Sequence, residues 1–467
     1  MRTLDTPESR TRNAVLIRRE AHGPRGLPVL GHLIHLARDP LGFLSDCARE
    51  YGDVVALRLG TWPTLLISDP ELIEAVLVKN HRSFVKNSFF WRQVTAVFGS
   101  GLLTSEGEFW QRQRRLAAPA FAGQRLAMYG DVMVHHTQRM LDGWRTGVGR
   151  DLHADMMGLT LRIAAKTLFG SDVHEDVVEI DHAVNDLADE MASRMARPFV
   201  IPDGVPLPGH IRYRRGLRKI EQVIARIVNE RRARNEDGGD LLSMLMLARD
   251  EHGHPMSDRQ LRDEAITILL AGHETTALAL SWAWVLIADH PDVQAELAGE
   301  VSDVLRDRAA TVEDLPRLRY AEHIVMEAMR LYPPAWLIGR EALRDCEIGG
   351  YPVHAGTTIY MSPWIVHRNG RYFEQPEEFR PGRWAGGLGR KIPRFAYFPF
   401  GGGPRICIGN RFAMMEAVLI LATIVQRFRI ERQKDRPVIP LPSITLRPKT
   451  GVWIVPATER SSRADRL

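Results

Sequence analysis

The stretch Phe400-Gly-Gly-Gly-Pro-Arg-Ile-Cys-Ile-Gly409 decides how the rest of the chain is interpreted. Three glycines, a proline and an arginine precede Cys407, and no second cysteine lies nearby to form a metal-binding or redox pair. Glycines tolerate positive φ and let the backbone approach a flat ligand closely. A single thiolate in such a loop suits one axial bond to a large cofactor, whereas a lone cysteine elsewhere is usually an ordinary buried residue.

An apolar run follows this loop. Residues 410–426 predict a helix whose N-terminus points at Cys407, where the helix dipole favours an anion and lowers the pKa of the thiol. The backbone N–H groups that follow Cys407 are placed to donate hydrogen bonds to its sulfur. Such bonds tune the electronic properties of a bound metal.

The loop resembles the haem-binding loop of the cytochrome P450 family, which reads F-x-x-G-x-R-x-C-x-G. The matching positions are Phe400, Gly403, Arg405, Cys407 and Gly409. The resemblance implies that Cys407 is the axial thiolate of haem b, and in this family the thiolate donates electron density that favours O–O cleavage. It also implies a cytochrome P450-like fold, mainly α with a small β-rich region.

The apolar stretch from Ala265 to Ala288 has a composition that could suit a transmembrane helix. His273 and Glu274 lie near its centre, however, and charge at the middle of a bilayer is costly. The stretch therefore predicts a long buried helix, with Ser257 and Gln260 as a capping box at its start.

The segment Ala271-Gly-His-Glu-Thr-Thr276 in this helix breaks local helix rules. Glycine costs about 1 kcal/mol relative to alanine there, and threonine is β-branched and bonds back to carbonyls four residues earlier. Such a conflict indicates a functional site; the alternative is a tolerated kink with a solvated glutamate. The segment resembles the oxygen groove of the family, which implies that Glu274 and Thr275 deliver protons to bound dioxygen.

Two further segments predict a structural charge network. The spacing of Glu327 and Arg330 puts both side chains on one helix face, although such pairs are usually exposed and contribute little. The pair matches the E-x-x-R motif of the family. Phe379-Arg-Pro-Gly-Arg-Trp384 resembles its F-x-P-E-R-F motif, with Gly382 where the family often has glutamate. The resemblance implies a network of Glu327, Arg330 and Arg383 behind the haem loop.

Trp110-Gln-Arg-Gln-Arg114 matches the W-x-x-x-R motif of the family, with both end residues on one helix face. The resemblance implies that Trp110 and Arg114 hold a haem propionate. Arg405 and Arg340 are further candidates, because a guanidinium fork matches a carboxylate. His81 is a weaker one, since a lone histidine is more often a solvated or core residue.

The resemblance assigns the substrate pocket by position only. The candidates are Phe98, Leu103, Ala271, Ala335, Trp336, Leu337 and Ile444. The catalytic Thr275 also faces this pocket, and residues 89–91 either line its entrance or belong to the core. Because the candidates are apolar, an apolar substrate fits best.

Composition bounds the architecture. The chain has 467 residues, of which 45% are hydrophobic and 25% charged, as in a globular protein, and it has no linker rich in glycine or serine. We expect a flexible N-terminal arm at 1–22, a single catalytic domain at 23–456 and a polar C-terminal tail at 457–467. Candidate strands lie at 54–59 and 64–67, and residues 235–239 form a loop.

Charge and cysteine usage exclude several classes of protein. The net charge of +5 is spread along the chain, so nucleic acid is a poor candidate partner. Three cysteines, far apart and odd in number, argue against a disulfide framework and favour a reducing compartment. Residues 1–21 are polar and arginine-rich, with no apolar stretch for an anchor. We expect a cytoplasmic monomer without a membrane anchor.

The combined interpretation is a haem-thiolate monooxygenase that inserts one oxygen atom from O2 into an apolar molecule of the lipid, terpenoid or polyketide class. Electrons from NAD(P)H would arrive through a ferredoxin or flavodoxin and its reductase, because no flavin or iron–sulfur domain is fused to the chain. The predicted docking face comprises Lys391, Arg394, Arg411, Arg112 and Arg115. The alternatives are a haem-thiolate peroxygenase or isomerase, and a non-catalytic haem-binding protein. The Glu274-Thr275 pair favours the monooxygenase.

Overall fold

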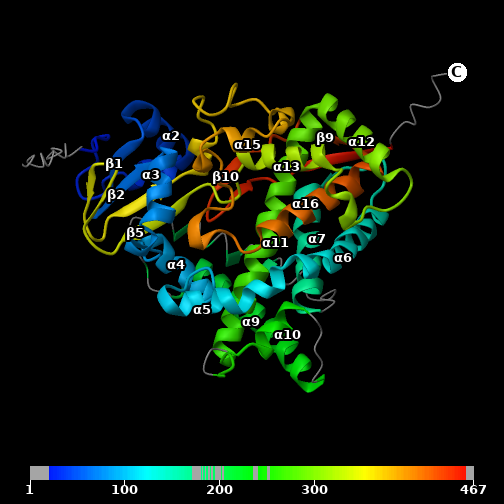
Figure 1. Cartoon of the computed structure of the whole chain (residues 1–467), viewed down its shortest axis with the longest axis horizontal. Coiled ribbons are helices and arrows are strands. Elements are labelled where there is room, and N and C mark those ends of the chain that lie inside the picture. The colour runs from blue at the N-terminus through cyan, green and yellow to red at the C-terminus, as the bar shows by residue number, and fades with distance from the viewer. Residues whose placement is uncertain are drawn as a thin grey trace, which may run out of the picture.

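The computed structural model describes residues 20–170, 205–234, 240–249 and 253–458, with scattered positions between 180 and 201. Most of the predicted arm and tail, and the predicted loop at 235–239, lie outside the described residues. Figure 1 shows the described part as a sheet-rich end around β1, β2 and β5, and a helical end around α6, α7, α12 and α16.

Helices make up most of the described chain. The α-helices are α1 (Leu33–Arg38), α2 (Pro40–Tyr51), α3 (Pro70–Glu74), α4 (Phe89–Phe98), α5 (Gly107–Ala117), α6 (Gly123–Asp142), α7 (Leu152–Phe169), α9 (Pro208–Arg234), α10 (Leu241–Leu247), α11 (Asp258–Asp289), α12 (Pro291–Leu305), α13 (Arg319–Leu331), α14 (Pro363–Val366), α15 (Leu388–Lys391) and α16 (Asn410–Val425). Short 3-10 turns, including η4 (Val312–Asp314) and η7 (Gly403–Arg405), and one π-helical turn, η1 (Ala75–Lys79), connect them. The mainly α prediction is confirmed.

The strands form small sheets. They are β1 (Val54–Leu59), β2 (Trp62–Ile67), β3 (Phe84–Val85), β4 (Arg150–Asp151), β5 (Ile338–Ala342), β6 (Cys346–Ile348), β7 (Tyr351–Val353), β8 (Thr358–Met361), β9 (Phe428–Arg432), β10 (Pro440–Pro442), β11 (Leu446–Pro448) and β12 (Trp453–Thr458). The largest sheet has the order β1-β2-β8-β5-β3, with β2 and β8 parallel and its other pairs antiparallel. The strand predicted at 54–59 is confirmed, and β2 begins two residues before the predicted 64.

Local sequence signals explain several element ends. The predicted capping box of Ser257 and Gln260 is present at the start of α11. Asp39 caps α2, which has Pro40 at its first position. Helix α13 ends at Leu331, two residues before the first of two prolines, as expected since a residue before proline avoids the helical region.

Helix α11 organises the helical core. It packs against α7, α13, α16 and α9, and most of its side chains are buried in one large apolar cluster. Two smaller apolar clusters lie against the β-sheet, one of them around Leu66 and Trp336. No helix in the described ranges is long and apolar enough to cross a bilayer.

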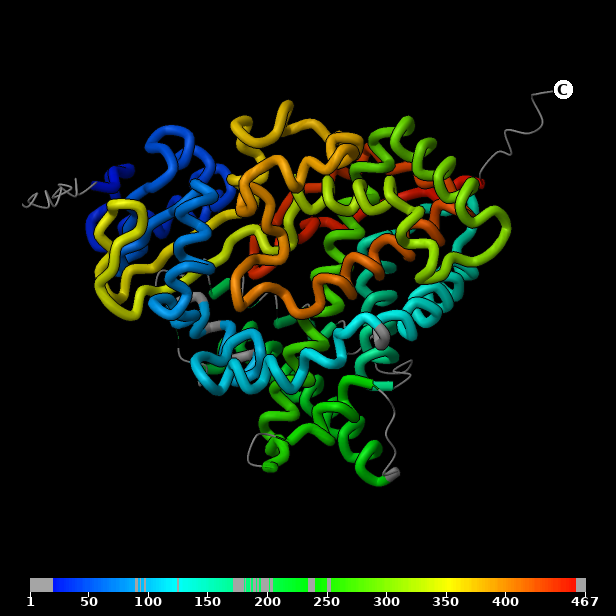
Figure 2. Tube along the Cα trace, in the orientation of Figure 1, coloured from blue at the N-terminus to red at the C-terminus, as the bar shows by residue number. Residues whose placement is uncertain are grey.

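The segment that leads into α16 lies in front of α11 and between the sheet-rich and helical ends (orange in Figure 2). This segment contains Cys407, and α16 itself contacts both α11 and α6. The predicted helix at 410–426 is observed one residue shorter, at Asn410–Val425. The helix that follows the cysteine loop therefore packs directly on the long central helix.

Candidate functional site

The Cys407 loop is held by its own backbone. Its ends are closed by a hydrogen bond from the Cys407 N–H to the carbonyl of Phe400, at 3.0 Å. Gly403 has a φ of +66°, and a Cβ there would lie 1.9 Å from the Leu77 carbonyl oxygen. Only glycine satisfies both constraints. The Arg114 guanidinium donates to the carbonyl of Ile406 at 2.9 Å, which ties the loop to α5.

Cys407 is enclosed and yet accessible. Protein surrounds the thiol closely enough that burial raises its pKa, although the N–H of Gly409 and the charges of Arg114 and Lys86 oppose this effect. The side chain nevertheless retains exposed surface. The predicted direction of the pKa shift was wrong for the free thiol, because desolvation outweighs the Gly409 hydrogen bond and the two nearby cations. The predicted donation from a backbone N–H after Cys407 is present.

Four cations gather beside this loop. Burial, followed by repulsion from Arg340 and Arg405, holds the pKa of Lys86 well below its usual range. Burial and the charge of Arg405 lower the pKa of Arg340 to about 10. Arg405 stacks over the Trp110 ring at 4.2 Å and donates to the carbonyl of Ser105 and the carboxylate of Glu106. Arg114 completes the set, with its guanidinium 6.0 Å from the same ring.

This cluster is unbalanced in charge. Within the described residues, Glu106 is the carboxylate that Lys86, Arg340 and Arg405 face. It forms an ion pair with Arg405 and accepts a hydrogen bond from the backbone N–H of Lys86 at 2.7 Å. The Nη1 atom of Arg405 is buried without a hydrogen-bond partner in the described part of the chain. An excess of buried cations needs anions to offset its desolvation cost. The donor set therefore fits the two propionates of a haem.

The structure brings together Trp110, Arg114, Arg340 and Arg405 from the sequence prediction. It adds Lys86 and Glu106, which the sequence analysis missed. Glu106 directly precedes α5 and could have been noticed four residues before Trp110, but no local pattern marks Lys86. The weaker candidate His81 bonds to the Val78 carbonyl within its own turn, at 2.9 Å.

Helix α11 has accessible surface at one place within an otherwise buried stretch. Between Asp263 and Ile287 every residue is buried except Ala271, Gly272, Glu274 and Thr275. These four share one face, as the spacing i, i+1, i+3, i+4 requires. The helix stays continuous through Gly272, and the Thr275 hydroxyl bonds back to the Ala271 carbonyl at 2.7 Å. An acid and an alcohol are thus presented at an interior surface of the longest helix described.

The predicted structural network is assembled on α13. Glu327 and Arg330 are both fully buried and form a two-pronged ion pair, with both bonds at 2.9 Å. Arg383 donates to the same carboxylate at 2.8 Å. The indole of Trp384 and the N–H of Arg380 donate as well, at 2.9 and 3.0 Å. The Glu327 carboxylate thus accepts hydrogen bonds from all of these donors. A carboxylate with no free acceptor position has a structural role.

The pocket candidates are placed unevenly. Phe98 is buried in the helical core, and Leu103 and Ile444 pack partly against the same core. Ala335 is half-buried, and Leu337 packs partly against the sheet-side core. Trp336 is the most buried of them: it is 3% exposed, belongs to the sheet-side core and donates its ring N–H to the Ser443 carbonyl. Its place in the substrate pocket stays a prediction.

A cysteine loop, a cluster of propionate-binding cations and an acid–alcohol pair on a long buried helix together define a haem-thiolate enzyme. The comparison with known families agrees: the cytochrome P450 family matches residues 21–455. The chain belongs to the cytochrome P450 family, whose members bind haem iron through a cysteine thiolate. It is a cytochrome P450 monooxygenase, an oxidoreductase.

Individual relatives extend along almost the whole chain. Cyclooctatin synthase of Streptomyces melanosporofaciens is 37% identical over 452 residues, 96% of this chain and 95% of its own. Cyclooctat-9-en-7-ol 5-monooxygenase of the same organism is 36% identical over 91% of this chain and 90% of its own. Pentalenene oxygenase of Streptomyces avermitilis is 33% identical over 91% and 94%.

Proposed function

We propose that this cytochrome P450 inserts one oxygen atom from O2 into an apolar terpenoid substrate, using electrons from NAD(P)H delivered by a separate protein. The observation that carries the proposal is the single opening on α11, where Glu274 and Thr275 are accessible in an otherwise buried stretch. A proton-delivering pair has no use beside a cofactor that does not reduce dioxygen. Haem b, when bound, supplies the iron at which dioxygen is activated.

Each group of residues has a separate task in this proposal. Cys407 would provide the thiolate that holds the haem iron, and the Gly409 N–H would stabilise its negative charge. Lys86, Arg340, Arg405 and Arg114 would neutralise the haem propionates. Glu274 and Thr275 hold and pass protons at the α11 opening. The Glu327 network keeps the loop region folded.

The names of the relatives support the substrate class. Pentalenene is by its name an unsaturated hydrocarbon, and cyclooctat-9-en-7-ol is an unsaturated cyclic alcohol. Both names describe mainly apolar molecules with at most one hydroxyl group. Together with the apolar candidates Leu103, Ala271 and Ile444, this favours a cyclic terpenoid over a fatty acid or a polyketide.

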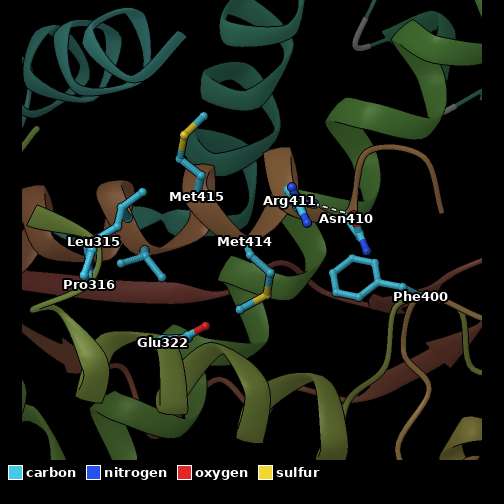
Figure 3. Close-up of a pocket in the computed structure, with 9 residues that line it drawn as sticks. Leu315, Pro316, Glu322, Phe400, Asn410, Arg411, Met414 and Met415 are labelled. Atoms are coloured by element: carbon cyan, nitrogen blue, oxygen red, sulfur yellow. Dashed lines mark hydrogen bonds between the residues drawn. The ribbon is translucent and has the colours of Figure 1, made fainter. Parts of the chain in front are cut away.

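We further propose a docking face for a small acidic electron carrier beside the Cys407 loop. Lys391, Arg394, Arg411 and Arg115 are exposed, whereas Arg112 is half-buried and contributes less than predicted. An open groove of about 410 Å3 adjoins this face, with Arg411 and Phe400 at one end (Figure 3). It is lined by Leu315, Pro316, Glu322, Phe400, Asn410, Arg411, Met414, Met415 and Val418. The groove is lined mainly by apolar side chains, with Glu322 and Arg411 as its charged residues. The exposed cations of the face beside it would steer an acidic carrier into place.

A turnover experiment tests the proposal against its alternatives. The holoprotein is supplied with a cyclic terpene and either O2, NAD(P)H, a ferredoxin and its reductase, or peroxide alone. We expect product only with the electron carrier, and Thr275→Ala should divert electrons to hydrogen peroxide. Product with peroxide alone would favour a peroxygenase. A rearranged product without added oxygen would favour an isomerase, and no product at all would favour a non-catalytic haem protein.

The axial ligand has its own spectroscopic test. Reduced protein with carbon monoxide should show the red-shifted Soret band of a thiolate-bound haem, and Cys407→Ser should lose it. Cys346→Ser is the matched control, because this thiol is half-buried on β6. A band that survives in Cys407→Ser would exclude Cys407 as the ligand.

A further inference from the structure

The Glu274 carboxylate is held by the C-terminal hairpin. Its Oε1 atom accepts three hydrogen bonds: from Thr445 Oγ1 at 2.6 Å, from Arg447 Nη2 at 2.7 Å and from Arg447 Nε at 2.9 Å. Both side chains of the ion pair are largely buried, with 16% of Glu274 and 11% of Arg447 exposed. The acid predicted to serve the α11 opening is therefore tied to a residue 173 positions further along the chain.

The hairpin is a firm support for this contact. Strands β10 and β11 are antiparallel, with Pro442 opposite Leu446, and the hairpin contacts α11. Leu446 is fully buried: its N–H donates to the Pro334 carbonyl at 3.0 Å, and its carbonyl accepts from the Trp282 indole at 2.9 Å. Because side chains alternate along a strand, Thr445 and Arg447 point to one face of the hairpin and Leu446 points to the other. The main chain thus aims both at Glu274.

The surrounding charges favour the ionised acid. Burial raises the pKa of Glu274, but the charge of Arg447, hydrogen bonds from Thr445 and Arg447, and the charge of His273 outweigh it, so the pKa lies below its ordinary value. From α7, His153 faces Glu274, and Asp151, at the N-terminal end of that helix, acts on His153. Burial lowers the pKa of His153 to about 4, with Arg447 adding to the effect, so this ring is neutral at pH 7. Among the described residues, Arg447 is the cation that contributes most to the low pKa of Glu274.

We propose that Arg447, assisted by Thr445, is a positioning residue for proton delivery: it holds the Glu274 carboxylate against the C-terminal hairpin, and Glu274 serves Thr275 only after leaving it. The inference deepens the proposed function and rests on it. Ile444, a pocket candidate, is the neighbour of Thr445 at the hairpin tip. A substrate that presses on this tip therefore acts on the segment that holds the acid.

The proton balance of the step is simple. Glu274, once released, takes one proton from a solvent acid and becomes neutral. It then passes a proton to the Thr275 hydroxyl as that hydroxyl gives its own proton to the groove. Glu274 returns as a carboxylate to Arg447, and one proton has moved from solvent to the groove.

Infrared titration of the holoprotein tests the holding contact without reference to turnover. The protonated-carboxyl band that is absent from Glu274→Gln reports the titration of Glu274. We expect Arg447→Met to move its midpoint upward by about one to three pH units, because the paired cation is lost. Arg447→Lys should recover most of the shift, and Thr445→Val should move the midpoint by less than about one unit. Thr445→Val also serves if Arg447→Met fails to bind haem.

Arg432→Met is the matched control, because Arg432 pairs with Asp289 at 2.9 Å on β9 and is similarly sheltered, at 17% exposure. It should leave the Glu274 midpoint where it is in the parent protein. A midpoint that stays constant in both Arg447→Met and Thr445→Val would overturn the inference, because Arg447 would then be only a structural residue.

The pH profile of coupling, measured as product per NAD(P)H, gives the second readout. We expect it to move with the infrared midpoint in Arg447→Met, and the Glu274→Gln change to abolish this pH dependence in both backgrounds. Additive effects of Arg447→Met and Glu274→Gln would contradict a role through Glu274. If Glu274→Gln and Thr275→Ala couple as well as the parent protein, the proposed proton-delivery function fails, and the infrared titration still decides whether Arg447 holds the acid.

Discussion

Two clusters of buried charge, one around Glu327 and one around Arg405, contain similar side chains in a different balance. In the first, all three guanidinium nitrogens of Arg330 donate, to Glu327 and to the carbonyls of residues 367, 376 and 378. In the second, three of the four cations face Glu106, and Arg405 keeps a buried nitrogen without a partner in the described chain. A saturated cluster stabilises the fold, whereas an unsaturated one is prepared for a ligand that the chain does not supply.

Breaking the saturated cluster should have the largest effect. Glu327→Gln removes the charge that Arg330 and Arg383 share and leaves two buried guanidinium groups uncompensated. We expect a loss of about 3–5 kcal/mol in the free energy of unfolding, measured by denaturant titration of the holoprotein, with little folded protein recovered.

The control is Glu377→Gln, because Glu377 pairs with Arg368 but is 71% exposed. It should change the free energy of unfolding by less than about 1 kcal/mol. Equal effects of the two substitutions would remove the distinction between the saturated cluster and an ordinary surface pair.

Glu416 sharpens the comparison, since it is a buried acid without a cation. It is 1% exposed on α16, and burial raises its pKa to about 8, opposed by the hydroxyl of Thr276. Because this pKa is higher in the folded than in the unfolded protein, the stability it contributes is full below pH 4.5 and is lost as pH rises through 8. Glu416→Gln should flatten this decline, which amounts to a few kcal/mol (roughly 2–5).

The measurement is the melting temperature as a function of pH. Glu264→Gln is the matched variant, because burial raises the pKa of Glu264 to about 7 and its decline should end at a lower pH. A Glu416→Gln curve that runs parallel to the parent curve between pH 5 and 8 would show that another group titrates there.

A substitution in the unsaturated cluster around Arg405 should weaken haem binding and leave stability nearly unchanged, whereas a substitution in the Glu327 network lowers stability. Lys86→Met removes a cation whose burial is unfavourable, so the protein should keep its stability to within about 1 kcal/mol. Haem should be lost roughly 10–100 times faster, because one charged hydrogen bond to a propionate is missing. Haem transfer to excess apomyoglobin measures this rate. Lys79→Met, an exposed lysine paired with Glu74, should not change it.

Exposed charge should produce the smallest effect. Arg411→Glu at the edge of the groove in Figure 3 should raise the apparent KM for an acidic ferredoxin by about 3- to 10-fold at low salt, and the difference should vanish at high ionic strength. Substrate affinity should not change. Arg429→Glu reverses an exposed charge on β9 and is the control. The same KM in Arg411→Glu and parent protein would move the docking face elsewhere.

Local patterns led correctly to much of this protein. The capping box predicted the start of α11, and the candidate strand at 54–59 was found as β1. One prediction failed: the direction of the pKa shift of Cys407 depends on how many atoms from distant segments surround the thiol. Burial is a property of the packed molecule, and a motif does not report it.

The sequence by itself determined the class of protein, because the Cys407 loop, the α11 segment and the Glu327-Arg330 pair are each encoded within a few neighbouring residues. Only the tertiary structure decided that Lys86 joins the cation cluster and that Arg447 holds Glu274. These contacts join residues far apart along the chain. Their existence depends on how helices and hairpins pack, and the energies that create them arise from burial and charge balance in three dimensions.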